Sequence, residues 1–276
     1  EPYPVLTSSA ASDVYRDSHK ARKRFGQNFL HDPLVIQRIV QAINPLRGQR
    51  LLEIGPGQGA ITLPLLRACR HLEVVELDRD LIQPLADKAA TAGELVIHQQ
   101  DALRFDFRSL ADGERLRTVG NLPYNISTPL LFHLLEQADA IQDMHFMLQK
   151  EVVDRMAAAP GGGDYGRLSV MIQYHCRVEP LFRVGPGAFK PAPRVDSALV
   201  RLTPWPQPPF PVKDTGLLTT LVRQAFSQRR KTLRNALKGL LSEQGIRATG
   251  TDPAARPETI GVEQYVALAN QLETET

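Results

Sequence analysis

The stretch LLEIGPGQGAIT, which runs from Leu51 to Thr62, decides the fold that this sequence predicts. It starts as an apolar strand, and Gly55, Gly57 and Gly59 then follow directly before a helical pattern. Glycine lets the backbone turn sharply and approach a ligand closely, and the start of a helix adds favourable dipoles. The stretch therefore predicts a strand, a ligand-binding turn and a helix. A tight turn without a ligand would use the same glycines.

Apolar runs on both sides of this stretch alternate with helical patterns, for example over residues 60–68 and 129–137. Strands that alternate with helices are typical of βαβ units, so we expect an α/β fold with a doubly wound, mostly parallel sheet. Ligands of such sheets bind at the carboxyl ends of the strands. The predicted strands cover residues 50–54, 72–77, 95–98, 116–119, 145–148 and 198–202.

The proline-rich stretch TPWPQPPFPVKD, from Thr203 to Asp214, interrupts this pattern. Proline breaks helices and withholds a hydrogen-bond donor from a sheet, so the stretch is typical of a linker. We place a domain boundary near residue 207, between an α/β domain over residues 20–206 and a small all-helical domain over residues 207–276 that packs on it. Residues 1–19 are expected to form a disordered tail.

The composition is ordinary for a globular protein, because 42% of the 276 residues are hydrophobic and 23% are charged. No apolar run has the length of a membrane-spanning helix, and the first residues lack the pattern of a secretory signal. The two cysteines, Cys69 and Cys176, and the scattered histidines show no metal-binding spacing. We therefore expect a cytoplasmic protein with no membrane and no metal partner, and we expect it to be a monomer.

Two segments concentrate positive charge, although the formal net charge is only +3. The second of them, RQAFSQRRKTLRNALK from Arg223 to Lys238, contains six basic residues and no acid above an apolar helical stripe. A solvated helix face usually mixes charges of both signs, so this segment favours contact with a polyanion such as RNA. The candidate RNA-binding residues are Arg22, Lys23 and Arg24 in the first segment and Arg223, Arg229, Arg230, Lys231 and Arg234 in the second.

Acidic residues lie at the ends of the next two predicted strands or directly after them. Glu76 lies about twenty residues beyond Gly55, the offset expected for an acid that binds ribose hydroxyls, and Asp78 is a nearby competitor. Asp101 could accept a hydrogen bond from an adenine amino group, with Ala102 as part of an apolar slot. Asp101 could equally cap a helix. Together these residues predict a site for a ligand that carries a ribose and an adenine.

The sharpest signal is Asn121-Leu122-Pro123-Tyr124, which directly follows the fourth predicted strand. This turn suits methylation of an amino group on an aromatic ring, whose lone pair is delocalised into the ring. The Asn121 oxygen and the Leu122 carbonyl can each accept one N–H of that amino group, which aims the lone pair at a methyl donor. Pro123 stiffens the turn, and Tyr124 offers a flat face for stacking a flipped base. The alternative is an ordinary proline turn after a strand.

With these motifs in the same order, the chain resembles the bacterial ribosomal RNA adenine dimethyltransferases of the small subunit. The resemblance extends from about residue 20 to the C-terminus. Erythromycin-resistance methylases share the early motifs, whereas YGRLSV and QRRKTLRNAL look more like the small-subunit enzymes. The matching stretches include RKRFGQNFLHD, EIGPGQGAIT, VVELDRDL, QQDALRFDF, VGNLPYNISTPLLFHLL, MLQKEVVDRM and VGPGAFKPAPRVDSALVRL.

The resemblance implies a Rossmann-like methyltransferase sheet, with S-adenosylmethionine as the methyl donor. It implies that the substrate is a pair of adjacent adenines in the hairpin near the 3′ end of small-subunit rRNA, each methylated twice, on RNA or an immature subunit. Phe189 resembles a second aromatic residue that sandwiches the flipped base with Tyr124, but it could also be a core residue. Together with Gly57 and Ala102, the residues expected at the donor are Gln27, Asn28, Leu30, Gly55, Glu76, Asp101 and Asn121.

Three other functions remain open at this level. A nicotinamide dehydrogenase would share the glycine turn and Glu76, but it gives no reason for the Asn121–Tyr124 turn or the basic segment. An RNA-binding assembly factor would explain the basic segment, with methylation incidental. A related methylase that acts on large-subunit RNA would use the same chemistry on another substrate.

Overall fold

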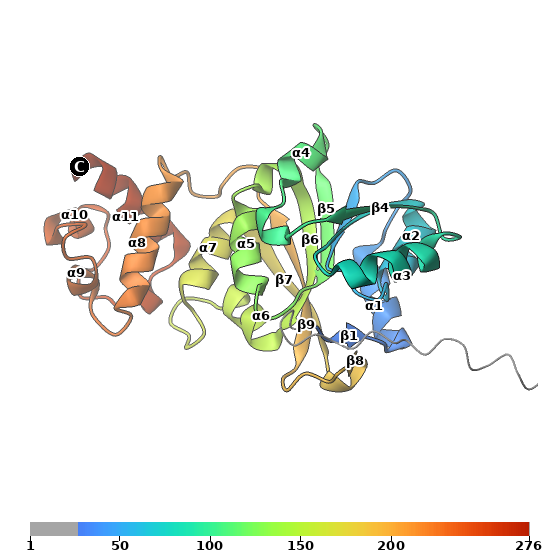
Figure 1. The fold of residues 1–276 in the computed structure, drawn as a ribbon. Helices are drawn as coiled ribbons and strands as arrows, with labels where there is room; N and C mark the ends of the chain where they lie inside the picture. The colour runs from blue at the N-terminus through green and yellow to red at the C-terminus, as the bar shows by residue number, and fades with distance from the viewer. Residues whose placement is uncertain (1–26, 276) are drawn as a thin grey trace, which may run out of the picture.

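The structure is a computed structural model, and it describes residues 27–275. The tail predicted over residues 1–19 lies outside the described residues. Among the described residues, a seven-stranded sheet forms the centre of the molecule, in the order β4-β3-β2-β5-β6-β9-β7 (Figure 1). The strands of this sheet are β2 (Leu51–Ile54), β3 (His71–Glu76), β4 (Glu94–Gln99), β5 (Leu116–Asn121), β6 (Ile141–Gln149), β7 (Cys176–Val184) and β9 (Ser197–Pro204).

The order of the strands shows which edge of the sheet is expected to bind a ligand. The five strands from β4 to β6 are parallel, whereas β9 runs antiparallel to both β6 and β7. From β2 the chain moves outward to β3 and β4 and then returns to β5 on the other side of β2. The carboxyl ends of β2 and β5 therefore meet at a topological switch point, where open α/β sheets bind ligands.

Helices cover both faces of the sheet, so the predicted doubly wound α/β fold is confirmed (Figure 1). Successive strand residues point to opposite faces. Leu51 accordingly lies in one core cluster and Leu52 in the other, as do Met147 and Phe146. One cluster contains α1 (Pro33–Ile43), α2 (Thr62–Cys69) and α3 (Arg79–Ala89), and the other contains α4 (Phe107–Ala111), α5 (Ser127–Leu135), α6 (Lys150–Ala157) and α7 (Arg167–His175).

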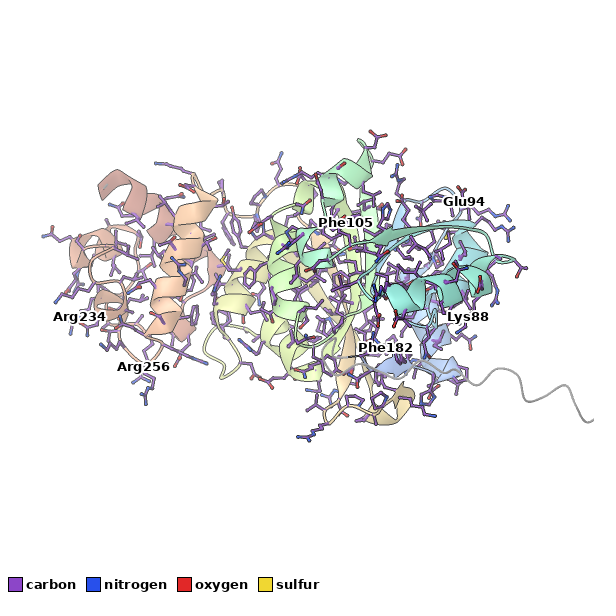
Figure 2. All side chains as sticks on the ribbon, in the orientation of Figure 1. Lys88, Glu94, Phe105, Phe182, Arg234 and Arg256 are labelled. Carbon is purple, nitrogen blue, oxygen red and sulfur yellow. The ribbon has the colours of Figure 1, made fainter. Side chains whose placement is uncertain are left out.

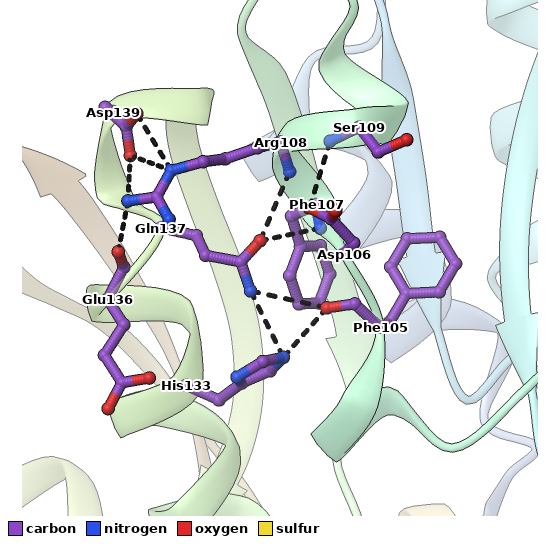
Figure 3. A network of polar contacts seen from close by, with 9 residues as sticks. All are labelled: Phe105, Asp106, Phe107, Arg108, Ser109, His133, Glu136, Gln137 and Asp139. Carbon is purple, nitrogen blue, oxygen red and sulfur yellow. Dashed lines mark hydrogen bonds and ion pairs between the residues drawn. The ribbon is translucent and has the colours of Figure 1, made fainter.

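A polar network fastens the segment after β4 to the end of α5 (Figure 3). The Gln137 side-chain oxygen accepts hydrogen bonds from the backbone N–H groups of Phe107 at 2.8 Å and Arg108 at 3.2 Å. The Gln137 amide nitrogen donates to the Phe105 carbonyl at 3.3 Å, and the Arg108 Nε donates to Asp139 at 2.9 Å. These bonds fix the course of the chain just beyond the 3₁₀ turn Ala102–Arg104 (η2), close to the ligand-binding edge.

The C-terminal helices form a unit to one side of the sheet (Figure 1). Their core cluster also includes Tyr165, Val170, Met171 and Tyr174 from α7 and the loop before it. The helical unit therefore shares its core with the α/β part, and the predicted boundary near residue 207 falls between β9 and α8. The unit contains α8 (Thr215–Ser227), α9 (Leu233–Ala236), α10 (Glu243–Ala248), the 3₁₀ turn η5 (Pro257–Thr259) and α11 (Val262–Glu275).

The basic segment is not the continuous helical stripe that its sequence predicts. Helix α8 ends at Ser227, and Gln228 leaves the helical region with φ −124° and ψ 40°. Helical structure resumes at α9. There the Leu233 N–H donates to the Ala255 carbonyl at 2.8 Å, and the Arg234 N–H donates to the Pro253 carbonyl at 3.1 Å. These two bonds to a distant segment replace the bonds that a continuous helix would have made.

Strand β7 has no counterpart among the predicted strands, and neither does the short pair of β1 (Phe29–Leu30) with β8 (Phe189–Lys190). This pair joins the N-terminal segment to the chain that precedes β9. Among the residues with a described position, no helix combines the length and the apolar character that crossing a bilayer requires.

Candidate active site

A cavity of about 310 Å³ opens at the carboxyl ends of β2, β3 and β5, where the strand order predicts a ligand site. Five segments that are distant in the sequence come together around it: the segment before α1, the glycine turn, the end of β3, the end of β4, and the turn after β5. The predicted site residues that line this cavity are Gln27, Asn28, Leu30, Gly55, Gly57, Glu76, Asp101, Ala102, Asn121, Leu122, Pro123 and Tyr124.

The glycine turn needs glycine at three positions. The φ angles of Gly55, Gly57 and Gly59 are 68°, 56° and 87°, a region that side chains with a Cβ rarely adopt. A Cβ on Gly57 would also lie 3.2 Å from the ring of Phe29. The Gly55 N–H donates to the Val75 carbonyl at 2.9 Å, which ties the turn to β3.

Glu76 is the last residue of β3 and lines the cavity with a side chain that is only 7% exposed. Its two carboxylate oxygens accept hydrogen bonds from the N–H of Gly57 at 3.2 Å and the N–H of Asp78 at 2.8 Å. Burial raises the pKa of Glu76, and these two bonds oppose the rise by stabilising the charged form. Glu76 therefore connects the strand end directly to the glycine turn.

Asp78, the competitor that the sequence left open, has another task. Its carboxylate caps α3 by accepting from the Asp80 N–H at 3.3 Å, and it accepts from the Gln27 side chain at 3.1 Å. Asp101 lines the cavity and also caps η2, because its side chain accepts from the Leu103 N–H at 3.0 Å.

Asn121 ends β5 beside the cavity, and its side-chain orientation is set by the N-terminal segment. The Asn121 amide nitrogen donates to the Asn28 carbonyl at 2.9 Å, so the amide oxygen remains available as an acceptor. The preceding residue is Gly120, where a Cβ would lie 2.5 Å from the Ile54 carbonyl oxygen. Only glycine at this position lets β5 approach β2 so closely, and this approach brings Asn121 next to the glycine turn.

Tyr124 is anchored at both ends. Its hydroxyl lies 2.6 Å from the Ser197 hydroxyl, and its carbonyl accepts a hydrogen bond from the Ser127 hydroxyl at 3.1 Å. Burial raises the pKa of Tyr124, so the ring stays neutral. Ser197 is fully buried at the start of β9, and the sequence contains no motif that would have identified it.

Phe189 does not join the other predicted substrate residues in this structure. Its side chain is 3% exposed and lies in the same core cluster as Leu30 and Val184, and Phe189 is not among the residues that line the cavity. In β8 it pairs with Leu30 of β1. This is the arrangement of a core phenylalanine, so the structure adds no support to a stacking role.

Glu53 lines the same cavity, although the sequence reasoning did not select it. It occupies the middle of β2, is 1% exposed, and its Oε2 has no hydrogen-bond partner among the described residues. Burial raises the pKa of Glu53 to about 8. The signal that could have identified it is an acid within the apolar run LLEI, because an isolated charge is costly in a core.

The cavity has a one-sided electrostatic character. The described residues that line it include the carboxyl side chains of Glu53, Glu76 and Asp101 but no lysine, arginine or histidine. Such a lining favours a ligand that carries positive charge and disfavours a pyrophosphate. The described residues contain no group of three or more His, Cys, Asp or Glu side chains that could hold a metal ion.

The predicted RNA-binding residues differ in their surroundings in the structure. Arg22, Lys23 and Arg24 lie outside the described residues. Arg229 pairs with Glu258 at 2.7 Å, and Arg234 lies 3.9 Å from Glu243. Figure 2 shows Arg234 and Arg256 projecting from the helical unit. The exposed members of the predicted set are Arg223, Arg230, Lys231 and Arg234.

Comparisons with known proteins agree over nearly the full chain. The family model described as "Ribosomal RNA adenine dimethylase" matches residues 18–274. The chain is 63% identical over 262 residues to the Ribosomal RNA small subunit methyltransferase A of Pseudomonas aeruginosa, which covers 95% of this chain and 97% of that protein. The protein of the same name from Nitrosococcus oceani is 61% identical over 251 residues, which covers 91% of this chain and 95% of that protein.

Two solved structures share the fold. A dimethyladenosine transferase from Plasmodium falciparum superposes with a TM-score of 0.72 at 24% identity, over 87% of this chain and 95% of that chain. The 23S rRNA methyltransferase ErmE superposes with a TM-score of 0.69 at 26% identity, over 89% of this chain and 100% of that chain. Because the family model and the relatives above 60% identity both span almost the whole sequence, the chain belongs to the ribosomal RNA adenine dimethylase family.

Proposed function

We propose that this chain is an rRNA adenine-N6 dimethyltransferase that methylates two adjacent adenines in the 3′-terminal hairpin of small-subunit rRNA and thereby takes part in small-subunit biogenesis. Membership of the adenine dimethylase family and the 63% identity to a small subunit methyltransferase support this function. One structural observation carries it: the turn from Asn121 to Tyr124 lies at the wall of a carboxylate-lined cavity that also contains the glycine turn and Glu76.

The cavity fits S-adenosylmethionine as the methyl donor. This molecule carries a sulfonium and an ammonium group, which suits a lining with three carboxyl groups and no cation among its described residues. Glu53 keeps its proton at neutral pH, because burial raises its pKa to about 8, so the carboxylates of this lining are those of Glu76 and Asp101. The pyrophosphate of a nicotinamide dinucleotide would meet these carboxylates instead, so the charge disfavours a dehydrogenase.

Each predicted donor residue has a task that its position allows. Glu76 would accept from the ribose hydroxyls, Asp101 would accept from the adenine amino group, and Ala102 would contact the adenine face. Gly55 and Gly57 would allow close approach of the backbone. Gln27, Asn28 and Leu30 would close the cavity from the N-terminal side. When bound, S-adenosylmethionine supplies an electrophilic methyl group.

The turn after β5 would position the acceptor amine. The amide nitrogen of Asn121 already donates to Asn28, so its oxygen can accept one N–H of the adenine amino group, and the Leu122 carbonyl can accept the other. Both bonds would turn the nitrogen lone pair toward the donor, so that positioning supplies much of the rate enhancement. Tyr124, fixed by Ser197, would stack on the flipped base. No base is needed before attack, since the methylated nitrogen is acidic and releases its proton to water.

The exposed residues Arg223, Arg230, Lys231 and Arg234 would contact RNA phosphates from the helical unit. Arg22, Lys23 and Arg24 stay predicted contacts of the N-terminal segment. A cytoplasmic location and a monomeric state also stay predictions. The partner would be small-subunit rRNA, either free or in an immature subunit.

Labelled-methyl transfer tests this function. Purified protein and labelled S-adenosylmethionine are incubated with unmethylated small subunits, and the modified nucleosides are mapped by digestion and mass spectrometry. We expect label in dimethyladenosine at two adjacent positions of the 3′-terminal hairpin. Large-subunit RNA serves as the control for the alternative substrate class, and label found only there would contradict the proposal. Binding of RNA without any methyl transfer would instead favour an assembly factor.

A further inference from the structure

Arg229 differs from its neighbours in the basic segment because its side chain binds within the protein. Its Nε donates to Glu258 Oε2 at 2.7 Å, and its Nη2 donates to the Gly163 carbonyl at 2.7 Å. The side chains of Arg229 and Glu258 are 39% and 24% exposed. Arg230 and Lys231, the next two residues, are exposed. The same Nη2 also lies 3.4 Å from the Gly162 carbonyl, so the guanidinium of Arg229 is engaged with one acid and two backbone carbonyls.

Glu258 bonds both to Arg229 and to the loop that Arg229 contacts. Its backbone carbonyl accepts a hydrogen bond from the Gly161 N–H at 2.7 Å, while its side chain accepts from Arg229. Gly161 has a φ of 89°, so glycine is required where the loop turns toward Glu258. Arg229 and Glu258 together thus bind the glycine-rich loop over residues 158–166, which connects α6 to α7.

An aromatic cluster lies beside these polar contacts. Tyr165, from the same loop, is fully buried, and its ring centroid lies 6.2 Å from that of Phe226 on α8. The Phe226 ring lies 5.8 Å from that of Tyr265 on α11, and the Tyr265 hydroxyl donates to the Pro257 carbonyl at 2.7 Å. The residue before Glu258 is therefore held in place by the core of the helical unit.

We propose that Arg229 and Glu258 form a clamp between the helical unit and the loop over residues 158–166, which keeps the exposed Arg230 and Lys231 in a fixed position relative to the methyl-transfer cavity. Arg229 is then a positioning residue and not an RNA contact. The consequence for RNA rests on the proposed function, whereas the clamp itself is a property of the free protein.

Glu258→Gln separates the two roles of Arg229 because they predict opposite effects. If Arg229 contacted RNA, removal of its acidic partner would free the guanidinium and tighten RNA binding. If Arg229 is part of the clamp, Glu258→Gln and Arg229→Gln both loosen the loop, and neither one tightens RNA binding. Arg229→Lys adds a second test, because it keeps the charge but loses the planar fork that reaches Glu258 and the loop carbonyls at the same time.

The experiment uses the full chain and four readouts. They are amide hydrogen exchange over residues 158–166 without RNA, affinity for S-adenosylmethionine, the salt dependence of binding to an unmethylated rRNA fragment with the 3′-terminal hairpin, and kcat/KM for methyl transfer to that fragment. For Arg229→Gln, Arg229→Lys and Glu258→Gln we expect exchange in the loop to rise by roughly three- to tenfold, as for loss of a partly exposed charged network. We expect the affinity for the donor and the slope of log K against log salt to stay unchanged. At the same time kcat/KM for RNA falls.

Arg230→Gln is the matched control. It should leave loop exchange unchanged and reduce the magnitude of the salt slope by about 0.7–0.9, the value for one phosphate contact. The clamp is wrong if Glu258→Gln tightens RNA binding, or if Arg229→Gln lowers the salt slope without raising loop exchange. Because exchange is measured without RNA, a wild-type protein that transfers no methyl group would refute the proposed function and leave the clamp testable.

Discussion

Asn121 shows how a residue of the site depends on a distant part of the chain. An amide side chain can present either its oxygen or its nitrogen, and the proposed chemistry needs the oxygen. The Asn28 carbonyl, at 2.9 Å, binds the nitrogen and so selects the orientation. The Ser197 hydroxyl, 2.6 Å from the Tyr124 hydroxyl, likewise holds the Tyr124 ring in place. At this scale the proposed substrate site consists of a four-residue turn and two supporting groups from other segments.

Replacement of Asn121 by alanine should lower kcat by roughly 100-fold or more, because it removes an acceptor that acts on the reacting amine in the transition state. RNA affinity should change little, since phosphate contacts dominate it. Single-turnover methyl transfer and a filter-binding titration measure the two effects separately. Turnover within a few-fold of the wild type would refute the role assigned to Asn121.

Glu53 predicts a pH dependence of stability. Burial raises its pKa from an ordinary 4.5 to about 8, so between these values the folded chain keeps a proton that the unfolded chain releases. The stability that this group contributes is therefore present at low pH and is lost as pH rises through that window. In Glu53→Gln the unfolding free energy should fall less steeply with pH, by up to about 1.4 kcal/mol per unit. Urea denaturation at several pH values measures this.

The exposed Glu114 supplies the control for this measurement. Glu114→Gln makes the same chemical change at an exposed position outside the cavity, so its unfolding curves show what the substitution alone does. Equal slopes for Glu53→Gln and the wild type would show that the Glu53 carboxyl ionises as it does in water.

Among the elements, most of those that carry the site could be predicted from sequence patterns, with β1 as the exception. The strands β2, β3, β4, β5, β6 and β9 all appear where apolar runs indicated them. Strand β7 was missed because it lies at the sheet edge, where much of it is only partly buried. Its register with β9 also shifts between Pro180 and Phe182. Such a strand lacks the clear alternation of buried and exposed residues on which prediction depends.

The glycine turn offers a test at the scale of an element. Gly57→Ala places a Cβ at a φ of 56° and 3.2 Å from the Phe29 ring, so we expect donor affinity to fall by roughly tenfold. Gly113→Ala is the matched control, because its φ is 86° but a Cβ there meets nothing within 4 Å and the residue does not line the cavity. Calorimetric titration with S-adenosylmethionine should separate the two variants. Equal losses would mean that backbone strain, and not the cavity, determines binding.

In the whole molecule, α7 connects the two parts. Its residues Leu168 and Ile172 pack in a core cluster of the sheet, whereas Val170 and Met171 pack in the cluster of the helical unit. The helical unit therefore lacks a closed core of its own. We infer that the two parts unfold together, because α7 contributes buried residues to the core clusters of both.

Met171→Ala tests this dependence. Met171 is 3% exposed, so its truncation should lower the unfolding free energy by about 2–5 kcal/mol. Because the cluster is shared, amide protection should fall in α8 and α11 as well as in α7. Hydrogen exchange of the full chain measures all three helices at once. Unchanged protection in α8 and α11 would show that the helical unit is stable without α7.

The sequence by itself determined the order of the motifs, the doubly wound sheet, the glycine turn and the Asn121–Tyr124 turn, because these depend on local patterns of apolar residues, glycines and strand ends. Only the tertiary structure placed Glu76 rather than Asp78 in the lining of the cavity, brought Asn28 to Asn121 and Ser197 to Tyr124, and paired Arg229 with Glu258. These contacts join residues that are far apart in the chain. Their partners follow from how strands and helices pack in space, and no local pattern carries that information.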